Sequence, residues 1–114
     1  MDRAPITIAE TAPFIRKATK LLTAEELDDF RLYIALNPEA GDIIPETGGI
    51  RKVRWGRQAS GKRGGVRVIY FYYNASLPLY LITLYAKAER ENISPDEKHA
   101  MTQLVAMLKR QMKR

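Results

Sequence analysis

The sequence predicts an α+β fold, in which two amphipathic helices precede an antiparallel sheet of three to four strands and a third helix closes the chain. Apolar residues recur at helical spacing before residue 37 and after residue 94. Between them lie three runs rich in β-branched and aromatic residues, and the short turns that join these runs imply antiparallel pairing. A length of 114 residues with 46% hydrophobic residues suits one packed domain spanning residues 1–114.

The N-terminal third predicts a short strand and two helices. The alternation Ile6-Thr7-Ile8 after a proline is typical of a strand at a sheet edge. Apolar residues at helical spacing predict a first helix over residues 14–22. A second helix is expected to begin at Thr23-Ala24-Glu25-Glu26, a capping box in which side chains satisfy the free amides of the first turn, and to end at Asn37-Pro38.

The rest of the chain predicts three strands and the closing helix. The loop over residues 38–49 holds two prolines and three glycines and shows no periodicity. The expected strands are Ile50–Trp55, Val66–Tyr73 and Leu79–Tyr85. A second capping box, Ser94-Pro95-Asp96-Glu97, opens a helix in which apolar residues recur at i, i+3, i+4, i+7 and i+11 from Met101.

Positive charge is concentrated in the middle of the chain. Between Gly49 and Arg90 there are nine lysines and arginines against one acidic residue, Glu89, whereas the preceding 48 residues have an excess of acids. A basic segment of this kind, on predicted strands with aromatic residues beside it, indicates a surface that binds a polyanion. The composition therefore favours a nucleic-acid partner.

The composition also limits where the protein acts. No apolar run approaches a membrane span, which needs about 18 residues, and no signal-like stretch opens the chain. The sequence has no cysteine, which excludes disulfides and thiolate chemistry. We therefore expect a cytoplasmic protein without a membrane partner.

The alternation of side chains along a strand sorts the basic residues between two faces. On the first predicted strand Lys52 and Arg54 share one face, while Arg51 shares the other with the apolar Val53 and Trp55. If the strands pair as hairpins, five side chains converge on the face away from this apolar pair: Lys52, Arg54, Arg67, Tyr85 and Lys87. Arginine and lysine suit phosphate, and a tyrosine ring can stack on an unpaired base.

No cofactor is expected, because neither a nucleotide-binding loop nor a metal site is indicated by the remaining patterns in the sequence. Residues 56–62 fit most of a phosphate-binding loop, but Arg63 stands where a serine or threonine must bind Mg²⁺, and a strand follows in place of a helix. His99 is the only histidine and has no cysteine near it, so a metal site is not expected. The basic segment is also too poor in carboxylates for a two-metal nuclease.

Three segments taken in order resemble the RelE/HigB family of toxins from bacterial toxin–antitoxin pairs: Gly48–Trp55, Gly61–Tyr70 and Leu84–Lys87. The similarity runs from about residue 37 to residue 93. The resemblance implies a RelE-like fold and a metal-independent endoribonuclease, an mRNA interferase that cuts translated mRNA on the ribosome. The implied partners are an antitoxin, expected to be acidic because this chain is basic, the 70S ribosome with its mRNA, and operator DNA reached only through the antitoxin.

Matched to the family's motifs, the resemblance implies a catalytic set of four residues: Lys52, Arg54, Arg67 and Lys87. Four others are expected to contact the RNA: Arg51, Lys62, Arg63 and Tyr85. Two departures from the family stand out, because Ala88 occupies a position where some members have arginine and no tyrosine follows Lys87 before the last helix.

Two alternatives also agree with the sequence. The related ParE toxins have the same fold but poison DNA gyrase and do not cut RNA. A non-enzymatic nucleic-acid-binding module would account for the basic segment as well. The residues from Arg51 to Arg67 favour the nuclease.

Overall fold

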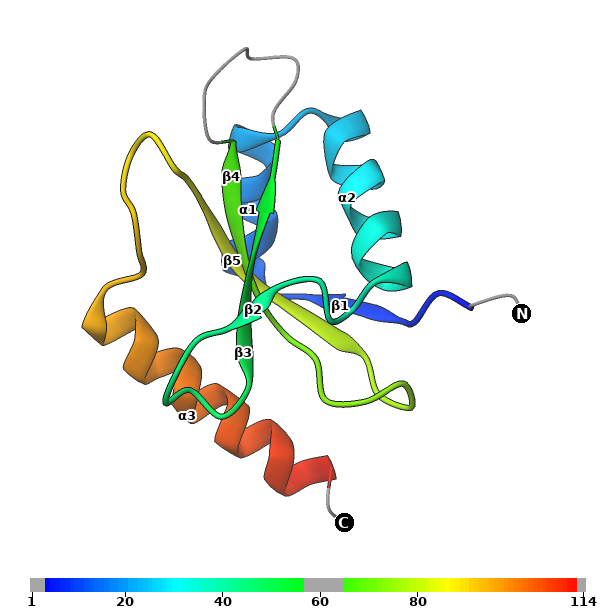
Figure 1. The fold of residues 1–114 in the computed structure, drawn as a ribbon, viewed down its shortest axis with the longest axis vertical. Coiled ribbons are helices and arrows are strands. Elements are labelled where there is room, and N and C mark those ends of the chain that lie inside the picture. Colours follow the sequence, from blue (N-terminus) through cyan, green and yellow to red (C-terminus); the bar gives the residue numbers. More distant parts are fainter. Residues whose placement is uncertain (1–3, 57–64, 113–114) are drawn as a thin grey trace.

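The computed structural model describes residues 4–56 and 65–112. Within them, three helices combine with a five-stranded sheet of order β1-β5-β4-β3-β2 (Figure 1). The elements follow one another as β1 (Ile8–Glu10), α1 (Ala12–Leu21), α2 (Ala24–Leu36), β2 (Asp42–Ile43), β3 (Ile50–Trp55), β4 (Val66–Phe71), β5 (Leu79–Ala86) and α3 (Pro95–Met112). The predicted α+β class and the order of its main elements are confirmed.

Both predicted capping boxes begin helices. The Thr23 hydroxyl accepts the amide of Glu26 at 3.1 Å, and the Glu26 carboxylate accepts the amide of Thr23 at 2.8 Å. Ser94 and Glu97 make the same reciprocal pair before α3, at 3.1 and 2.8 Å. Each box satisfies two amides that a helix start would otherwise leave unpaired, which is why these short local patterns locate the helix starts.

The three central strands pair antiparallel, as predicted, and β1 adds a parallel edge strand beside β5. The strand count exceeds the expected three to four because β2, of two residues, pairs antiparallel with β3. Both β2 residues are exposed. A strand this short has no alternation to detect, and its conformation follows from its pairing with β3.

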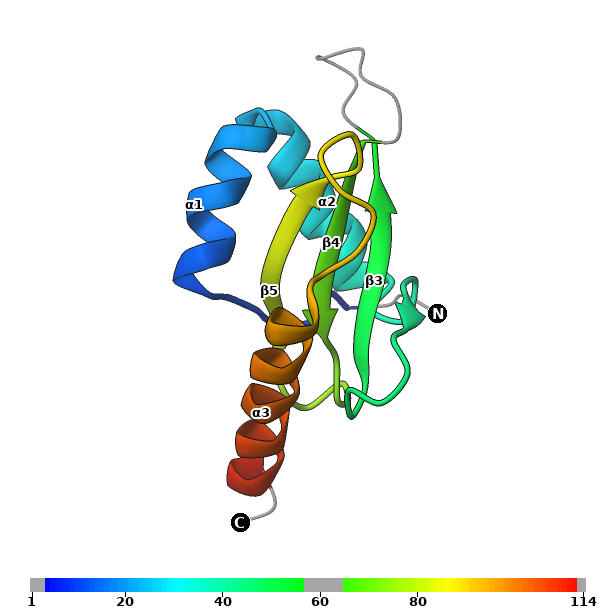
Figure 2. The same cartoon turned by 90° about the vertical axis from the view of Figure 1, so that its left-hand side faces the viewer.

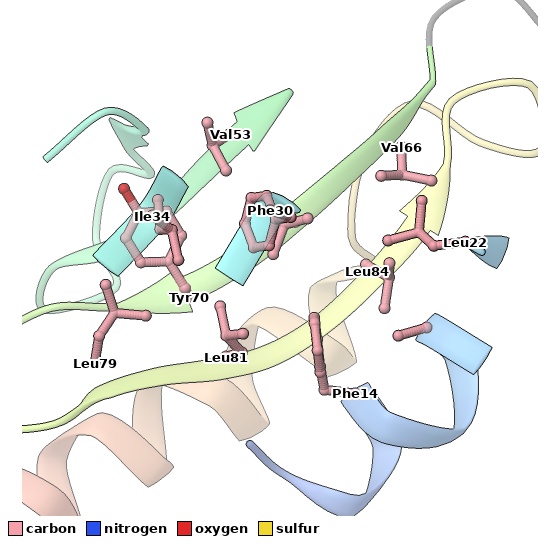
Figure 3. Packing of buried hydrophobic residues seen from close by; sticks show 12 residues of the cluster. Phe14, Leu22, Phe30, Ile34, Val53, Val66, Tyr70, Leu79, Leu81 and Leu84 are labelled. Carbon is pink, nitrogen blue, oxygen red and sulfur yellow. The ribbon is translucent and has the colours of Figure 1, made fainter. Parts of the chain in front are cut away.

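Helices cover the two faces of the sheet unequally. On one face α1 and α2 pack over a core that includes Phe14, Phe30, Tyr70 and Leu84 (Figure 3). On the other face α3 packs over Ile50, Ile69 and Phe71, among other residues. Figure 2 shows α3 along one end of the sheet only, while the connection from β5 to α3 passes over the end where β3 finishes and β4 begins. This end carries the predicted site.

An irregularity in β5 sets which residues face α3. Ile69 pairs with Thr83 but the next residue, Tyr70, pairs with Leu81, so Ile82 is an extra residue in β5. An extra residue reverses the alternation of side chains along a strand. As a result Leu81 and Leu84 both join the core under α1 and α2, whereas Tyr85 lies on the α3 face.

Among the helices of the described residues, none combines the length and the apolar character that crossing a membrane requires.

Candidate functional site

A row of cross-strand neighbours forms the centre of the site. Arg54 on β3 pairs with Arg67 on β4, and Arg67 pairs in turn with Tyr85 on β5. Lys52 lies two residues before Arg54 and so points to the same face. Arg54 is exposed, while Lys52 and Arg67 are partly exposed. Two guanidinium groups and an ammonium group therefore come from adjacent strands of one sheet, whose hydrogen bonds fix their spacing.

Lys87 is added to this face just beyond the end of β5. Its amide donates to the carbonyl of Gly65 at 3.1 Å, which continues the pairing of β5 with the start of β4. Gly65 has a φ of +53°, and a Cβ placed there would lie 2.2 Å from the carbonyl oxygen of Trp55. Only glycine fits so close to β3 in this conformation, so Gly65 brings β3, β4 and Lys87 together at one end of the sheet.

The connection from β5 to α3, residues 87–94, folds back onto these cations. The Glu91 carboxylate accepts the Lys87 ammonium at 2.8 Å, and the Asn92 side-chain oxygen accepts the Lys52 ammonium at 3.1 Å. The Tyr85 hydroxyl donates to the backbone carbonyl of Glu91 at 2.9 Å. Residues from β3, β5 and this connection are therefore held in one hydrogen-bonded group.

Arg90 anchors the same connection to the start of α3. Its guanidinium carbon lies 4.8 Å from the centre of the Tyr85 ring, and its two terminal nitrogens donate to Glu97 at 2.7 and 2.9 Å. The hydrogen bonds from Arg90, together with those from Ser94, lower the pKa of Glu97 from 4.5 to about 2 against the opposing effect of burial. Tyr85, Arg90 and Glu97 thus join the sheet to α3 beside the cations.

Hydrogen bonding and burial shift the pKa values of Glu91 and Tyr85, two members of this hydrogen-bonded group, in opposite directions. The hydrogen bond from Lys87, followed by the charge of the same ammonium, lowers the pKa of Glu91, and Lys52 adds to this effect. Burial raises the pKa of the Tyr85 hydroxyl, although Arg67 and Arg90 oppose the increase. At neutral pH Glu91, bound to Lys87, and Glu97, bound to Arg90, are therefore anionic, while the Tyr85 hydroxyl is neutral.

The eight residues expected from the sequence separate into three groups. The sheet brings five of them to one face: Lys52, Arg54, Arg67, Tyr85 and Lys87. Arg51 is not among them, because it lies on the opposite face, where its guanidinium donates to the carbonyls of Gly41 at 2.7 Å and Glu39 at 3.3 Å. Lys62 and Arg63 lie outside the described residues.

Tyr85 lies where it was expected but in another environment. From the sequence, its ring was expected to stack on an RNA base. The side chain is only 4% exposed, and the Arg90 guanidinium lies over the ring. In this conformation Tyr85 supports the connection after β5, through its contact with Arg90 and its hydrogen bond to Glu91.

Sequence reasoning missed Glu91 and Asn92. The signal that was present is the short spacing between Lys87 and the capping box at Ser94, which obliges the chain to turn back across the sheet within six residues. Within residues 4–56 and 65–112, no three histidine or acidic side chains are grouped closely enough to hold a metal ion.

Comparison with protein families places the chain in a known family. The model of the family described as "RelE toxin of RelE / RelB toxin-antitoxin system" matches residues 7–114, which is nearly the whole chain. Toxins of such systems have an antitoxin as their partner. The chain therefore belongs to the RelE toxin family and is a toxin of a toxin–antitoxin system.

Proposed function

We propose that this toxin is an mRNA interferase, a metal-independent endoribonuclease that cuts translated mRNA on the ribosome in the cytoplasm. The observation that carries the proposal is the cross-strand pair of Arg54 and Arg67, with Lys52 on the same face and Lys87 at its edge. Cations fixed on neighbouring strands suit a phosphate that gains negative charge during reaction, because they need little rearrangement to stabilise it.

The reaction uses a nucleophile that the RNA supplies. The ribose 2′-oxygen attacks the adjacent phosphorus while its proton passes to a base, and the bond from phosphorus to the 5′-oxygen breaks as that oxygen gains a proton. The products are a 2′,3′-cyclic phosphate and a free 5′-hydroxyl. Arg54 and Arg67 stabilise the charge on the pentacoordinate phosphorus, and the Lys87 ammonium protonates the leaving oxygen. Lys52, which shares a face with Arg54, is the proposed acceptor of the proton of the 2′-hydroxyl.

Dependence on the ribosome follows from the groups available. The single histidine, His99, lies on α3 and is not among the residues gathered on this face. Lysine is a weak acid and its neutral form is scarce at neutral pH, so proton transfer contributes little unless the message is held in line for attack. Fixing reactants in a reactive geometry lowers barriers by several kcal/mol, up to about 10 kcal/mol. We expect the decoding site to supply this alignment.

The test compares one message, naked and on programmed ribosomes, with EDTA present in a parallel reaction mixture that contains naked RNA. Cleavage that is strong on ribosomes, weak on naked RNA and leaves a 2′,3′-cyclic phosphate supports the proposal. The same assay is applied to Arg67→Ala, which is expected to lose cleavage on ribosomes. Its matched control is Arg110→Ala, which removes an exposed arginine of α3 away from the row of Arg54, Arg67 and Tyr85. Equal rates on the two substrates contradict ribosome dependence, and gyrase inhibition without RNA cleavage points to the ParE alternative.

The partner is proposed to be an acidic antitoxin. The excess of cations between residues 49 and 90 favours an anionic protein, and such a protein inhibits the toxin if it covers the β3–β4 face. Expression with the neighbouring open reading frame and purification through a tag on its product tests this. Recovery of free toxin that does not slow growth contradicts it.

A further inference from the structure

We propose that the small cavity between β3 and the start of α3 binds the nucleobase beside the cleaved phosphate, and that the Asn92 amide selects a purine over cytosine there. The inference rests on the proposed RNA cleavage and adds the determinant of base preference. The cavity has a volume of about 190 Å³ and is lined by Ile44, Lys52, Asn92, Ile93 and Lys98.

The composition of the cavity suits a planar heteroaromatic ring. Ile44 and Ile93 are half-buried and provide apolar walls, while Asn92 provides an amide and Lys52 and Lys98 provide cations. Ile44 is fixed to β3 by the hydrogen bond from its amide to the carbonyl of Ile50, at 2.8 Å. Apolar walls with a few converging polar groups are the usual form of a small-ligand site.

The cavity lies next to the cations on the sheet. Lys52 belongs to both, since it shares a face with Arg54 and its ammonium contacts the Asn92 side chain at 3.1 Å. Residues two apart on a strand are separated by about 7 Å, which is comparable to the reach of one nucleotide. A phosphate bound between Lys52 and Arg54 therefore places a neighbouring base next to Asn92.

The donors around the cavity favour a purine over cytosine. The Asn92 oxygen already accepts the Lys52 ammonium, so its amide NH₂ and the lysine ammonium groups remain as donors toward a ligand. Both purines present the N7 acceptor on the edge that side chains read, whereas cytosine presents an amino donor there. The Lys98 ammonium lies 3.9 Å from the Glu46 carboxylate, a long distance for an ion pair, so it can move to approach the same edge of the base. A purine therefore meets complementary groups, and cytosine meets donors with a donor.

Two substitutions at Asn92 test the selection. Asn92→Ala removes the amide and is expected to reduce the preference for purine over cytosine by roughly 5- to 20-fold, the lower part of the range for a side chain that reads a base edge. Asn92→Asp replaces the donor by an acceptor and is expected to move the preference toward cytosine. Asn74→Ala, in the turn between β4 and β5, is the matched control and leaves the preference unchanged.

The readout is the ratio of cleavage between sequences, because the carboxylate introduced by Asn92→Asp would also pair with Lys52 and change the absolute rate. Cleavage sites on ribosomes programmed with messages randomised at the decoded codon are mapped by sequencing. A wild-type purine preference that weakens in Asn92→Ala and moves toward cytosine in Asn92→Asp supports the inference. The same profile in all three proteins overturns it, and so does a wild-type enzyme that is indifferent to purines.

A binding measurement separates this inference from the proposed function. In NMR titrations of the wild-type protein, AMP is expected to shift the side-chain NH₂ signals of Asn92 and the methyl signals of Ile93, and CMP is expected to shift them less. If these shifts are seen but the protein cuts no RNA, the cavity is still a base-binding site and the proposed function is wrong. Their absence overturns the cavity as a base site even if RNA is cut.

Discussion

Replacing Glu97 by glutamine should destabilise the protein by an amount that depends on pH. Glu97 accepts two hydrogen bonds from Arg90, at 2.7 and 2.9 Å, and one from the amide of Ser94 at 2.8 Å. Glutamine keeps the bond from Ser94, since it serves equally well in a capping box, but it removes the charge that holds Arg90. The substitution therefore isolates the ionic pair from the helix cap.

The pKa of Glu97 sets the size of the effect. A fall from 4.5 to about 2 corresponds to roughly 3 kcal/mol of preference for the folded state. The carboxylate is 29% exposed and its partner Arg90 is 34% exposed, so solvent screening reduces this to about 1–2 kcal/mol. Because the folded pKa lies below the unfolded one, the stabilisation is fully present above pH 4.5 and is lost as the pH falls toward 2.

Urea unfolding of the wild type and of Glu97→Gln at several pH values between 7 and 2.5 measures the effect. At pH 7 we expect the variant to be less stable by about 1–2 kcal/mol, with a melting temperature lower by about 4–8 °C, and at pH 2.5 we expect the difference to fall to about a quarter of that value. Glu25→Gln, in the first turn of α2, is the matched control and should change stability by less than about 0.5 kcal/mol. Equal stability at pH 7, or a difference as large at pH 2.5 as at pH 7, would refute the reasoning.

Three further substitutions probe the site and its support. Arg67→Ala should lower single-turnover cleavage on ribosomes by about 10²–10³-fold with an unchanged melting temperature, whereas a joint loss of both would assign Arg67 a structural role. Glu91→Gln removes the carboxylate held by Lys87, so a non-cleavable RNA should bind more tightly in fluorescence anisotropy at low salt; weaker binding would contradict this. Tyr70→Phe removes a buried hydroxyl that donates to the Pro38 carbonyl at 2.9 Å and accepts the Gly41 amide at 2.8 Å, so it should cost about 1–3 kcal/mol in urea unfolding while cleavage is retained.

Features specified by neighbouring residues could be predicted from the sequence. The starts of α2 and α3 depend on side chains three residues apart, so the boxes at Thr23 and Ser94 were sufficient. The alternation along β3 likewise placed Lys52 and Arg54 on one face. The parallel pairing of β1 with β5 depends on contacts distant in the sequence, and β2 exists only through its pairing with β3. No local pattern in those short segments specifies either feature.

The candidate site shows the same division. The strand pattern already put Arg51 on the face of Val53 and Trp55, and its position in the basic segment nevertheless led to an RNA-binding assignment. Charge along the sequence does not distinguish a cation on the face of Arg54 and Arg67 from one, such as Arg51, that holds the carbonyls of Glu39 and Gly41. Glu91 and Asn92 could not be assigned because their positions depend on how α3 packs on the sheet.

The cations lie on or next to the strands of the sheet, whereas Glu91 and Asn92, which bind two of them, lie on the connection after β5. This arrangement bears on how a toxin with so cationic a face could leave RNA that is not being translated uncut. In the free protein the Lys52 ammonium is bound to Asn92 and the Lys87 ammonium to Glu91. Both partners lie on the connection after β5, which is anchored by Tyr85 and by the cap of α3. A flexible RNA must displace these contacts and also lose its own conformational freedom, at a cost of roughly 0.5–1.5 kcal/mol for each flexible group that is immobilised. A message already held by the ribosome has lost most of that freedom and presents its phosphates together. Breaking the contacts of Lys52 and Lys87 costs the same for both substrates, so the smaller ordering cost of ribosome-bound mRNA is the difference that the proposed selectivity for translated mRNA requires.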